Sequence, residues 1–162
     1  MADEKKLREA QVVYESICST YEEQGLKFKR HDEDFVITLG MSGEDIPMEF
    51  VMQVCAEAQI VRLYSRLPVS VGEDKTVEMA LATVYANSKI LNGAFDYDLQ
   101  ERTLSFNMFT AYHGSILGGE VFSYMLGTAA GTVDRVNDLF LMLGKGMITL
   151  EQFLERVNGL ME

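Results

Sequence analysis

Two stretches of alternating side chains decide the fold of this chain: residues 47–54 read PMEFVMQV, and residues 60–67 read IVRLYSRL. Successive side chains of a β-strand point to opposite faces, so every second position shares a face. The apolar positions that share a face are Met48, Phe50, Met52 and Val54 in the first stretch, and Val61, Leu63 and Leu67 in the second. This pattern predicts neighbouring strands of an antiparallel meander whose apolar face needs a helix packed on it.

Working outward, residues 26–30 and 35–39 are rich in β-branched and aromatic side chains and add two strands before this pair. Residues 94–98 and 103–110 alternate in the same way and predict a later hairpin. Apolar residues three and four apart predict helices over residues 4–24, from 73 to about 92, over 119–144 and from 149 to about 158. The second helix carries this spacing at Val77, Leu81, Val84 and Leu91, and Thr149 with Gln152 forms a capping box for the last.

The expected fold class is therefore α+β, with a mainly antiparallel sheet flanked by helices in the order α-ββββ-α-ββ-α-α. A length of 162 residues, 48% of them apolar and 24% charged, suits one globular domain over residues 1–162. No repeat, low-complexity tract or linker indicates a second domain.

The charge balance bounds the partners of the protein. With 25 acidic against 14 basic residues the formal charge is −11, which disfavours nucleic acid and anionic membranes and favours basic partners. The charged residues 1–8 are not a secretory signal, and no later run is long and apolar enough to span a bilayer. We expect a cytoplasmic protein in which Cys18 and Cys55 are ordinary reduced thiols.

Catalytic and metal-binding patterns are not recognisable in the sequence. The run from His31 to Asp34 favours a polar turn over a metal site, and His113 precedes a glycine without a recognisable partner. Asp96 and Asp98 are better explained as the solvent-facing positions of a strand than as paired acid and base. The glycine-containing steps lack the spacing of a phosphate-binding loop. We therefore expect no metal, no cofactor and no enzymatic activity.

Residues 27–108 resemble the YbjN family, bacterial proteins of poorly defined function whose fold is like that of type III secretion chaperones. In that family a strand closing on Leu-Pro leads to a helix, whose end carries an Asn shortly before a Gly-x-Phe strand. The matching residues here are Leu67, Pro68, Asn87, Gly93 and Phe95. The resemblance implies a sheet flanked by helices, frequently dimeric. In the chaperone relatives it implies a surface that holds an unfolded client segment, and the family is also described as regulating sensory transduction.

We accordingly expect a non-enzymatic protein- or peptide-binding homodimer, chaperone-like or regulatory, with a polypeptide client. Arg62, Tyr64 and Arg66 are candidate binding residues, and a helix-packing or dimer interface is expected at Val121, Met125, Gly127 and Gly131. Two alternatives remain open. One is an enzyme or small-ligand protein, with a pocket between sheet and helices where the first three residues converge with Asp98. The other is a structural subunit of a larger complex, marked by an exposed apolar patch over residues 121–133.

Overall fold

The computed structural model describes residues 3–161, in the element order that the sequence predicts. The helices are α1 (Glu4–Glu23), α2 (Thr76–Asn87), α3 (Gly119–Gly144) and α4 (Leu150–Met161). The strands are β1 (Lys29–His31), β2 (Val36–Met41), β3 (Met48–Cys55), β4 (Ile60–Arg66), β5 (Ala94–Asp98) and β6 (Thr103–Ala111). Short 3₁₀ turns lie at Asp32–Asp34 and Glu73–Lys75.

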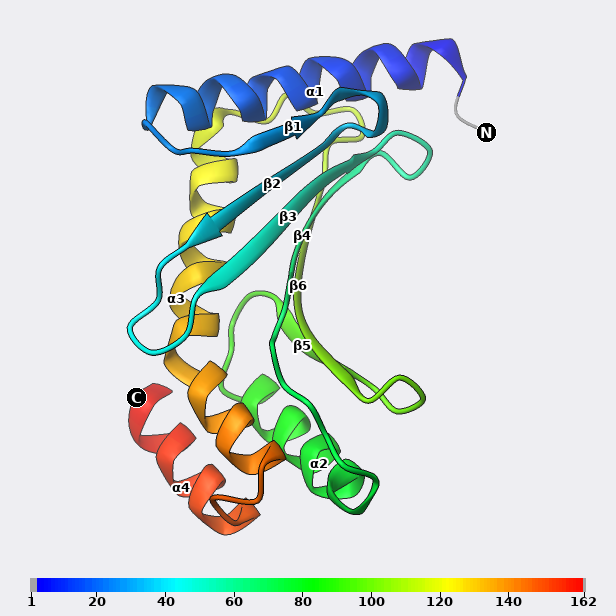
Figure 1. The fold of residues 1–162 in the computed structure, drawn as a ribbon. Coiled ribbons are helices and arrows are strands. Elements are labelled where there is room, and N and C mark those ends of the chain that lie inside the picture. The colour runs from blue at the N-terminus through cyan, green and yellow to red at the C-terminus, as the bar shows by residue number, and fades with distance from the viewer. Residues whose placement is uncertain (1–2, 162) are drawn as a thin grey trace.

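The six strands form one antiparallel sheet in the order β1-β2-β3-β4-β6-β5. The predicted meander and the predicted later hairpin are both present. The last strand, β6, folds back beside β4 and opposes Leu63 to Met108, which joins the two units into one sheet. As Figure 1 shows, α1 crosses one end of the sheet, α3 runs along one side of it, and α2 and α4 cluster at the other end. None of the helices within residues 3–161 lies on the other side, which we call the open face.

The helix-covered face holds the core. Every apolar position that the sequence assigned to this face of β3 and β4 is buried, including Phe50 and Leu63 at 0% exposure. At the lower end of the sheet the rings of four phenylalanines follow one another with centroids 4.9 to 5.1 Å apart. In order they are Phe106, Phe95, Phe140 and Phe153, from β6, β5, α3 and α4. Long-range aromatic packing therefore fastens both C-terminal helices to the sheet.

Several predicted boundaries differ from those of the structure, by one to five residues. The first strand is Lys29–His31 and not 26–30, because Leu26 closes the end of α1 by donating to the carbonyl of Tyr21, and Phe28 packs its ring edge on Tyr21. Helix α2 ends at Asn87 and not near Asn92. The capping box predicted for α4 is confirmed, since Thr149 and Gln152 exchange hydrogen bonds of 3.0 and 3.2 Å.

The residues that carry the family resemblance join elements of the fold. The Asn87 amide accepts from the backbone N–H of Phe95 at 2.7 Å and donates to its carbonyl at 2.8 Å, so α2 ends where β5 begins. Gly93 has a φ of +81°, and a Cβ there would overlap the Phe106 ring. The N–H of Leu67 donates to Leu104 at 2.9 Å, which extends the β4–β6 pairing. Backbone geometry and hydrogen bonding at these positions therefore account for the residue types that carry the resemblance.

Candidate binding surfaces

An apolar groove lies between α1 and the loop that joins β6 to α3. Its cavity volume is about 460 Å³. The lining residues are Arg8, Glu9, Val12, Val13, Ser16, Tyr112, Gly114, Ser115, Ile116 and Leu117. Val12 and Ile116 are 70% and 100% exposed, so two large apolar side chains of the groove face solvent. Sequence reasoning missed this groove, because Val12 lies off the buried stripe of α1 and only the apolar pair Ile116 and Leu117 marks the loop.

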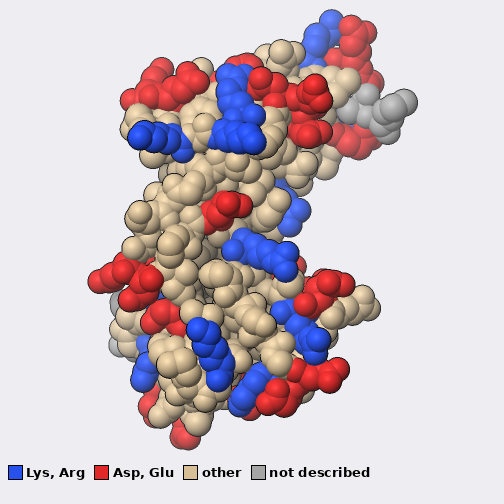
Figure 2. Space-filling model, viewed as in Figure 1, with Lys and Arg blue, Asp and Glu red and all other residues tan. Residues whose placement is uncertain are grey.

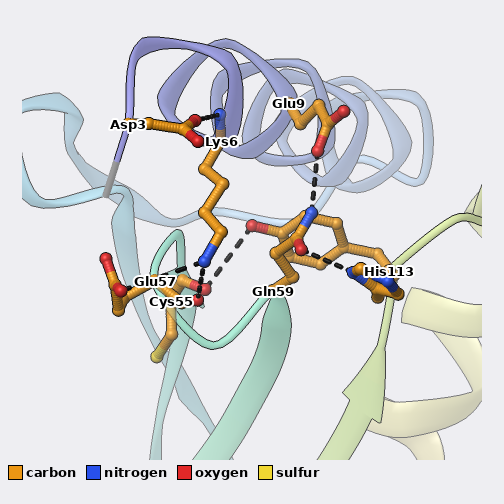
Figure 3. Close-up of polar contacts among 8 residues, drawn as sticks. Asp3, Lys6, Glu9, Cys55, Glu57, Gln59 and His113 are labelled. Atoms are coloured by element: carbon orange, nitrogen blue, oxygen red, sulfur yellow. Dashed lines mark hydrogen bonds and ion pairs between the residues drawn. The ribbon is translucent and has the colours of Figure 1, made fainter. Parts of the chain in front are cut away.

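A polar network connects the turn between β3 and β4 to α1 and to the loop after β6, and Figure 3 shows its contacts. Gln59, in the turn between β3 and β4, donates through Nε2 to Glu9 of α1 at 2.7 Å, and its Oε1 lies 2.5 Å from Nδ1 of His113. Because the Gln59 Oε1 can only accept, His113 carries a proton on Nδ1. On the same side, Lys6 donates to the carbonyl of Glu57 at 2.9 Å. The hairpin, α1 and the groove loop are therefore held together by the 7% exposed side chain of Gln59.

The turn between β1 and β2 is a structural joint. Asp32 accepts a hydrogen bond from the Tyr14 hydroxyl at 2.8 Å, and it forms an ion pair with Arg30 at 2.8 Å. The Arg30 guanidinium, with the Tyr14 hydroxyl, holds the pKa of the Asp32 carboxyl below its usual range. Burial, followed by the bond to Asp32, raises the pKa of Tyr14. These groups thus fasten β1 to α1.

Within residues 3–161, no three His, Cys, Asp or Glu side chains gather in a way that could hold a metal ion. His113 is hydrogen-bonded to the side-chain amide of Gln59, and His31 lies 3.4 Å from the Thr38 hydroxyl. Along the same residues, every helix is too short or too polar to cross a membrane.

The candidate residues Arg62, Tyr64 and Arg66 share the open face of β4, as period-two alternation requires. The Arg62 guanidinium lies 4.6 Å from the centre of the Tyr64 ring. Arg66 is exposed at the end of the strand, and Asp98 instead accepts from two backbone N–H groups of its own turn, at 2.8 and 2.9 Å. Because this face is opposite to the helices, the pocket expected between sheet and helices is not formed by these residues.

Helix α3 distributes its expected interface residues over two faces. Met125 is 3% exposed and belongs to the core, and Val121 is half-buried. Gly127 and Gly131 face outward, with open space where a Cβ would point. The exposed apolar patch expected over residues 121–133 was wrong, because its large members Phe122, Leu126 and Val133 are buried against the sheet and neighbouring helices.

Helix α2 exposes the apolar stripe that its spacing suggested. Val77, Leu81 and Val84 are 70%, 53% and 69% exposed, whereas Met79 and Ala86 on the opposite side are at 0%. The helix packs through its small side chains against β5, α3 and α4. The more apolar face of α2 is therefore left in solvent, and we call these three residues the α2 stripe.

The fold was compared with known proteins. No family model matches the chain, and no curated protein matches its sequence. Among the solved structures that match the fold, two are covered over most of their length. ExsC in the ExsC–ExsE complex has a TM-score of 0.55 at 14% identity, over 79% of this chain and 92% of that one. YbjN from E. coli, a proposed transcription regulator, has a TM-score of 0.57 at 10% identity, over 83% and 93%.

Its fold is that of YbjN and ExsC. The α+β arrangement and the similarity to YbjN and to type III secretion chaperones, both predicted from the sequence, are confirmed as a fold. At 10 to 14% identity the likeness does not extend to the residues of a site.

Proposed function

We propose that this protein is a non-enzymatic polypeptide-binding domain, chaperone-like or regulatory, which holds a segment of a partner protein in the groove beside α1. The observation that carries the proposal is the exposure of Val12 and Ile116 on facing walls of a preformed apolar groove. Exposed apolar surface rimmed by polar groups marks interaction sites, since covering it with an apolar partner is favourable.

The fold supports this proposal by analogy. ExsC, which shares the fold, was crystallised with ExsE. A sheet flanked by helices that leaves apolar surface uncovered is a scaffold on which a partner segment gains contacts without the protein unfolding. A likeness of fold does not identify the partner, so the groove of this chain has to be tested directly.

The occupant that fits is an amphipathic segment with apolar side chains on one side and basic ones beside them. The groove walls supply apolar contacts from Val12, Val13 and Leu117, and Glu9 stands at the rim with its carboxylate already fixed by Gln59. The formal charge of −11 steers basic segments toward the molecule. Burial raises the pKa of Tyr112, so this groove side chain stays neutral and adds no charge of its own.

The test uses charged substitutions at the exposed groove positions. Val12→Asp and Ile116→Asp place a carboxylate on each wall without touching the core, because both side chains are already in solvent. Matched controls are Leu99→Asp and Leu91→Asp, whose side chains are 62% and 106% exposed and belong neither to the groove nor to the α2 stripe. Each protein is immobilised in a native lysate, and retained polypeptides are quantified by mass spectrometry and then rebound in purified form.

A polypeptide that the wild type and both controls retain, and that both groove variants lose at least tenfold, supports the proposal. The expected loss follows from burying an unpaired carboxylate, which costs more than one hydrogen bond. Equal retention by groove and control variants, or no retained polypeptide, would exclude the groove as a polypeptide site. Thermal unfolding of each variant confirms that it is folded.

The homodimer expected from the sequence remains part of this proposal. The α2 stripe supports it, because an isologous dimer buries the same patch of both copies. Light scattering during gel filtration measures the mass, and Leu81→Asp is expected to shift a dimer to a monomer, whereas Val12→Asp is not. Gly131→Leu, with Gly159→Leu as an equally open helical control, tests the outer face of α3 in the same way.

A further inference from the structure

The open face of the sheet holds a half-buried arginine that has no acidic partner. The side chain of Arg62 emerges from the middle of β4 and gives Nε and Nη2 to the Oδ1 of Asn107 on β6, at 3.3 and 2.8 Å. Asn107 is itself fixed, since its amide donates to the Ser105 hydroxyl at 3.1 Å. Within residues 3–161, no carboxylate lies within 4.0 Å of the Arg62 guanidinium.

Two aromatic rings complete the setting of this guanidinium. Its carbon lies 4.6 Å from the centre of the Tyr64 ring and 5.8 Å from that of Phe109. An arginine has five N–H donors, of which two are used on Asn107. The described residues supply no acceptor for the remaining three. The guanidinium is therefore held in place with one edge open, which is the arrangement that a carboxylate engages.

The open-face positions that surround Arg62 directly carry no other formal charge. Each of the strands β3, β4 and β6 contributes three open-face positions to the patch around it, and Arg62 is the single formally charged residue among these nine. The other eight are Val51, Gln53 and Cys55, Ile60 and Tyr64, and Asn107, Phe109 and Ala111. Phe109 is 57% exposed. A cation among uncharged, partly apolar neighbours loses hydration without gaining a counter-charge, so a partner that supplies the carboxylate gains most at this point.

We propose that the open face of the sheet is a second polypeptide site, which takes an extended segment carrying an Asp or Glu flanked by apolar residues, with its carboxylate on Arg62. The flanking side chains cover Val51, Ile60 and Phe109. This site shares no residue with the groove beside α1, so it goes beyond the proposed function and does not rest on it.

Two other occupants of the open face, a nucleic acid and a second copy of this chain, fit less well. The acids at open-face strand positions, Glu49, Asp96 and Asp98, lie outside the patch, and with the whole chain at −11 they disfavour a phosphate backbone. A second copy of the chain is proposed to dock through the α2 stripe and not through this face. A short segment with one carboxylate between apolar side chains matches both the single cation of the patch and its apolar border.

The experiment selects binders from a random linear dodecapeptide library displayed on phage, using the wild-type protein as target and Arg62→Gln as counter-target. Enriched peptides are then synthesised with a fluorescent label, and their dissociation constants are measured by anisotropy. The matched control is Arg66→Gln, which removes the same charge from the same strand and face, but at an exposed side chain. Phe109→Ser removes the apolar border, and Ile116→Asp reports on the groove.

We expect enriched peptides to contain Asp or Glu between apolar residues. Arg62→Gln and Asp→Asn in the peptide should each weaken binding about tenfold or more, as the loss of a charge-assisted hydrogen-bonded pair requires. Phe109→Ser should also weaken it, and Arg66→Gln and Ile116→Asp should stay within about twofold, because an exposed charge contributes little. Two-dimensional NMR of the Arg62 Nε–H signal should show a shift on adding the peptide.

Failure to enrich acidic peptides, or equal binding to the wild type and Arg62→Gln, would overturn the proposal. So would binding that only Ile116→Asp abolishes, since those peptides occupy the groove. Two further results would assign the face otherwise. One is tight binding of a fluorescein-labelled oligothymidylate that Arg62→Gln removes; the other is a dimer that Arg62→Gln converts to a monomer.

Discussion

The two faces of β6 show how differently one sheet can treat the same side chain. Phe106 is 0% exposed and makes an edge contact with the ring of Phe95, whereas Phe109, three residues further along, is 57% exposed. Both faces of the sheet carry apolar residues, but only one face is covered by helices. The difference lies in what accompanies the apolar residues, because the open face mixes them with amides, hydroxyls and Arg62, which tolerate water.

The two arginines Arg30 and Arg62 differ in the partners that surround their guanidinium groups. Both guanidinium groups lie over a tyrosine ring, at 5.2 Å from Tyr14 and 4.6 Å from Tyr64. Arg30 also has two carboxylates, Glu15 at 2.7 Å and Asp32 at 2.8 Å, and so fastens β1 to α1. Arg62 has an amide in their place. Figure 2 shows acidic side chains gathered at the end of the molecule that α1 occupies and fewer charges across the middle. An arginine whose partners lie within the chain is structural, and one without a carboxylate is available to another chain.

The largest expected effect separates the two phenylalanines. Phe106→Ala should lower the free energy of unfolding by about 3–5 kcal/mol, because it removes a fully buried ring from the aromatic row. Phe109→Ala should change it by less than about 0.5 kcal/mol, since the ring is mostly in solvent. Urea unfolding followed by circular dichroism measures both. A loss at Phe109 as large as that at Phe106 would mean that the open face is covered in solution.

The order of elements and the core face could be predicted because both depend on local periodicity. Alternation in β3 and β4 identified the buried positions, and it also placed Arg62 beside Tyr64. The partners on β6 could not be predicted, because Asn107 lies 45 residues from Arg62 and periodicity carries no information about which strand pairs with which.

In helix α2 the sequence pattern identifies an apolar face of the helix but does not say whether that face is buried. Val77, Leu81 and Val84 have the spacing of a buried stripe, and yet Met79, Ala82 and Ala86 are the residues at 0% exposure. The face that packs against β5, α3 and α4 carries mostly small side chains, which allow close approach, and the stripe is left outside. The groove beside α1 escaped prediction for a related reason, since it forms where residues 8–16 meet residues 112–117, about a hundred residues apart.

A smaller loss of stability is expected at Gln59, which joins the turn between β3 and β4 to α1 and to the loop after β6. Gln59→Ala removes the bonds to Glu9 and His113 and should cost about 1–3 kcal/mol in the free energy of unfolding. Gln59 has a φ of +53°, and alanine meets the same backbone cost, so the substitution isolates the side chain. Hydrogen exchange should show faster exchange in the hairpin turn and in residues 112–117. Unchanged exchange there would show that the network does not hold the groove wall.

Substituting the two arginines should change stability by smaller amounts, and the effect of Arg30 should depend on pH. Arg30→Gln should lower the melting temperature at neutral pH more than Arg62→Gln does, because only Arg30 loses ion pairs. The pKa of Asp32 is lowered in the folded state, so its contribution is present above the ordinary aspartate pKa of about 4 and is lost as the pH falls through the folded value. The gap between wild type and Arg30→Gln should therefore narrow in acid. Equal losses for both variants at neutral pH would contradict the distinction.

The smallest effect concerns a carboxylate on the covered side. Burial, reinforced by the nearby charge of Asp45, raises the pKa of Asp138 on α3, which means that the fold disfavours its ionised form. Stability from this group is complete below the ordinary aspartate pKa and is lost as the pH rises through the raised folded value. Asp138→Asn does not titrate, so it should raise the melting temperature at neutral pH, and the advantage should vanish in acid. Asp96→Asn on the open face controls for net charge, and an equal gain from it would show that global repulsion, and not burial, is the cause.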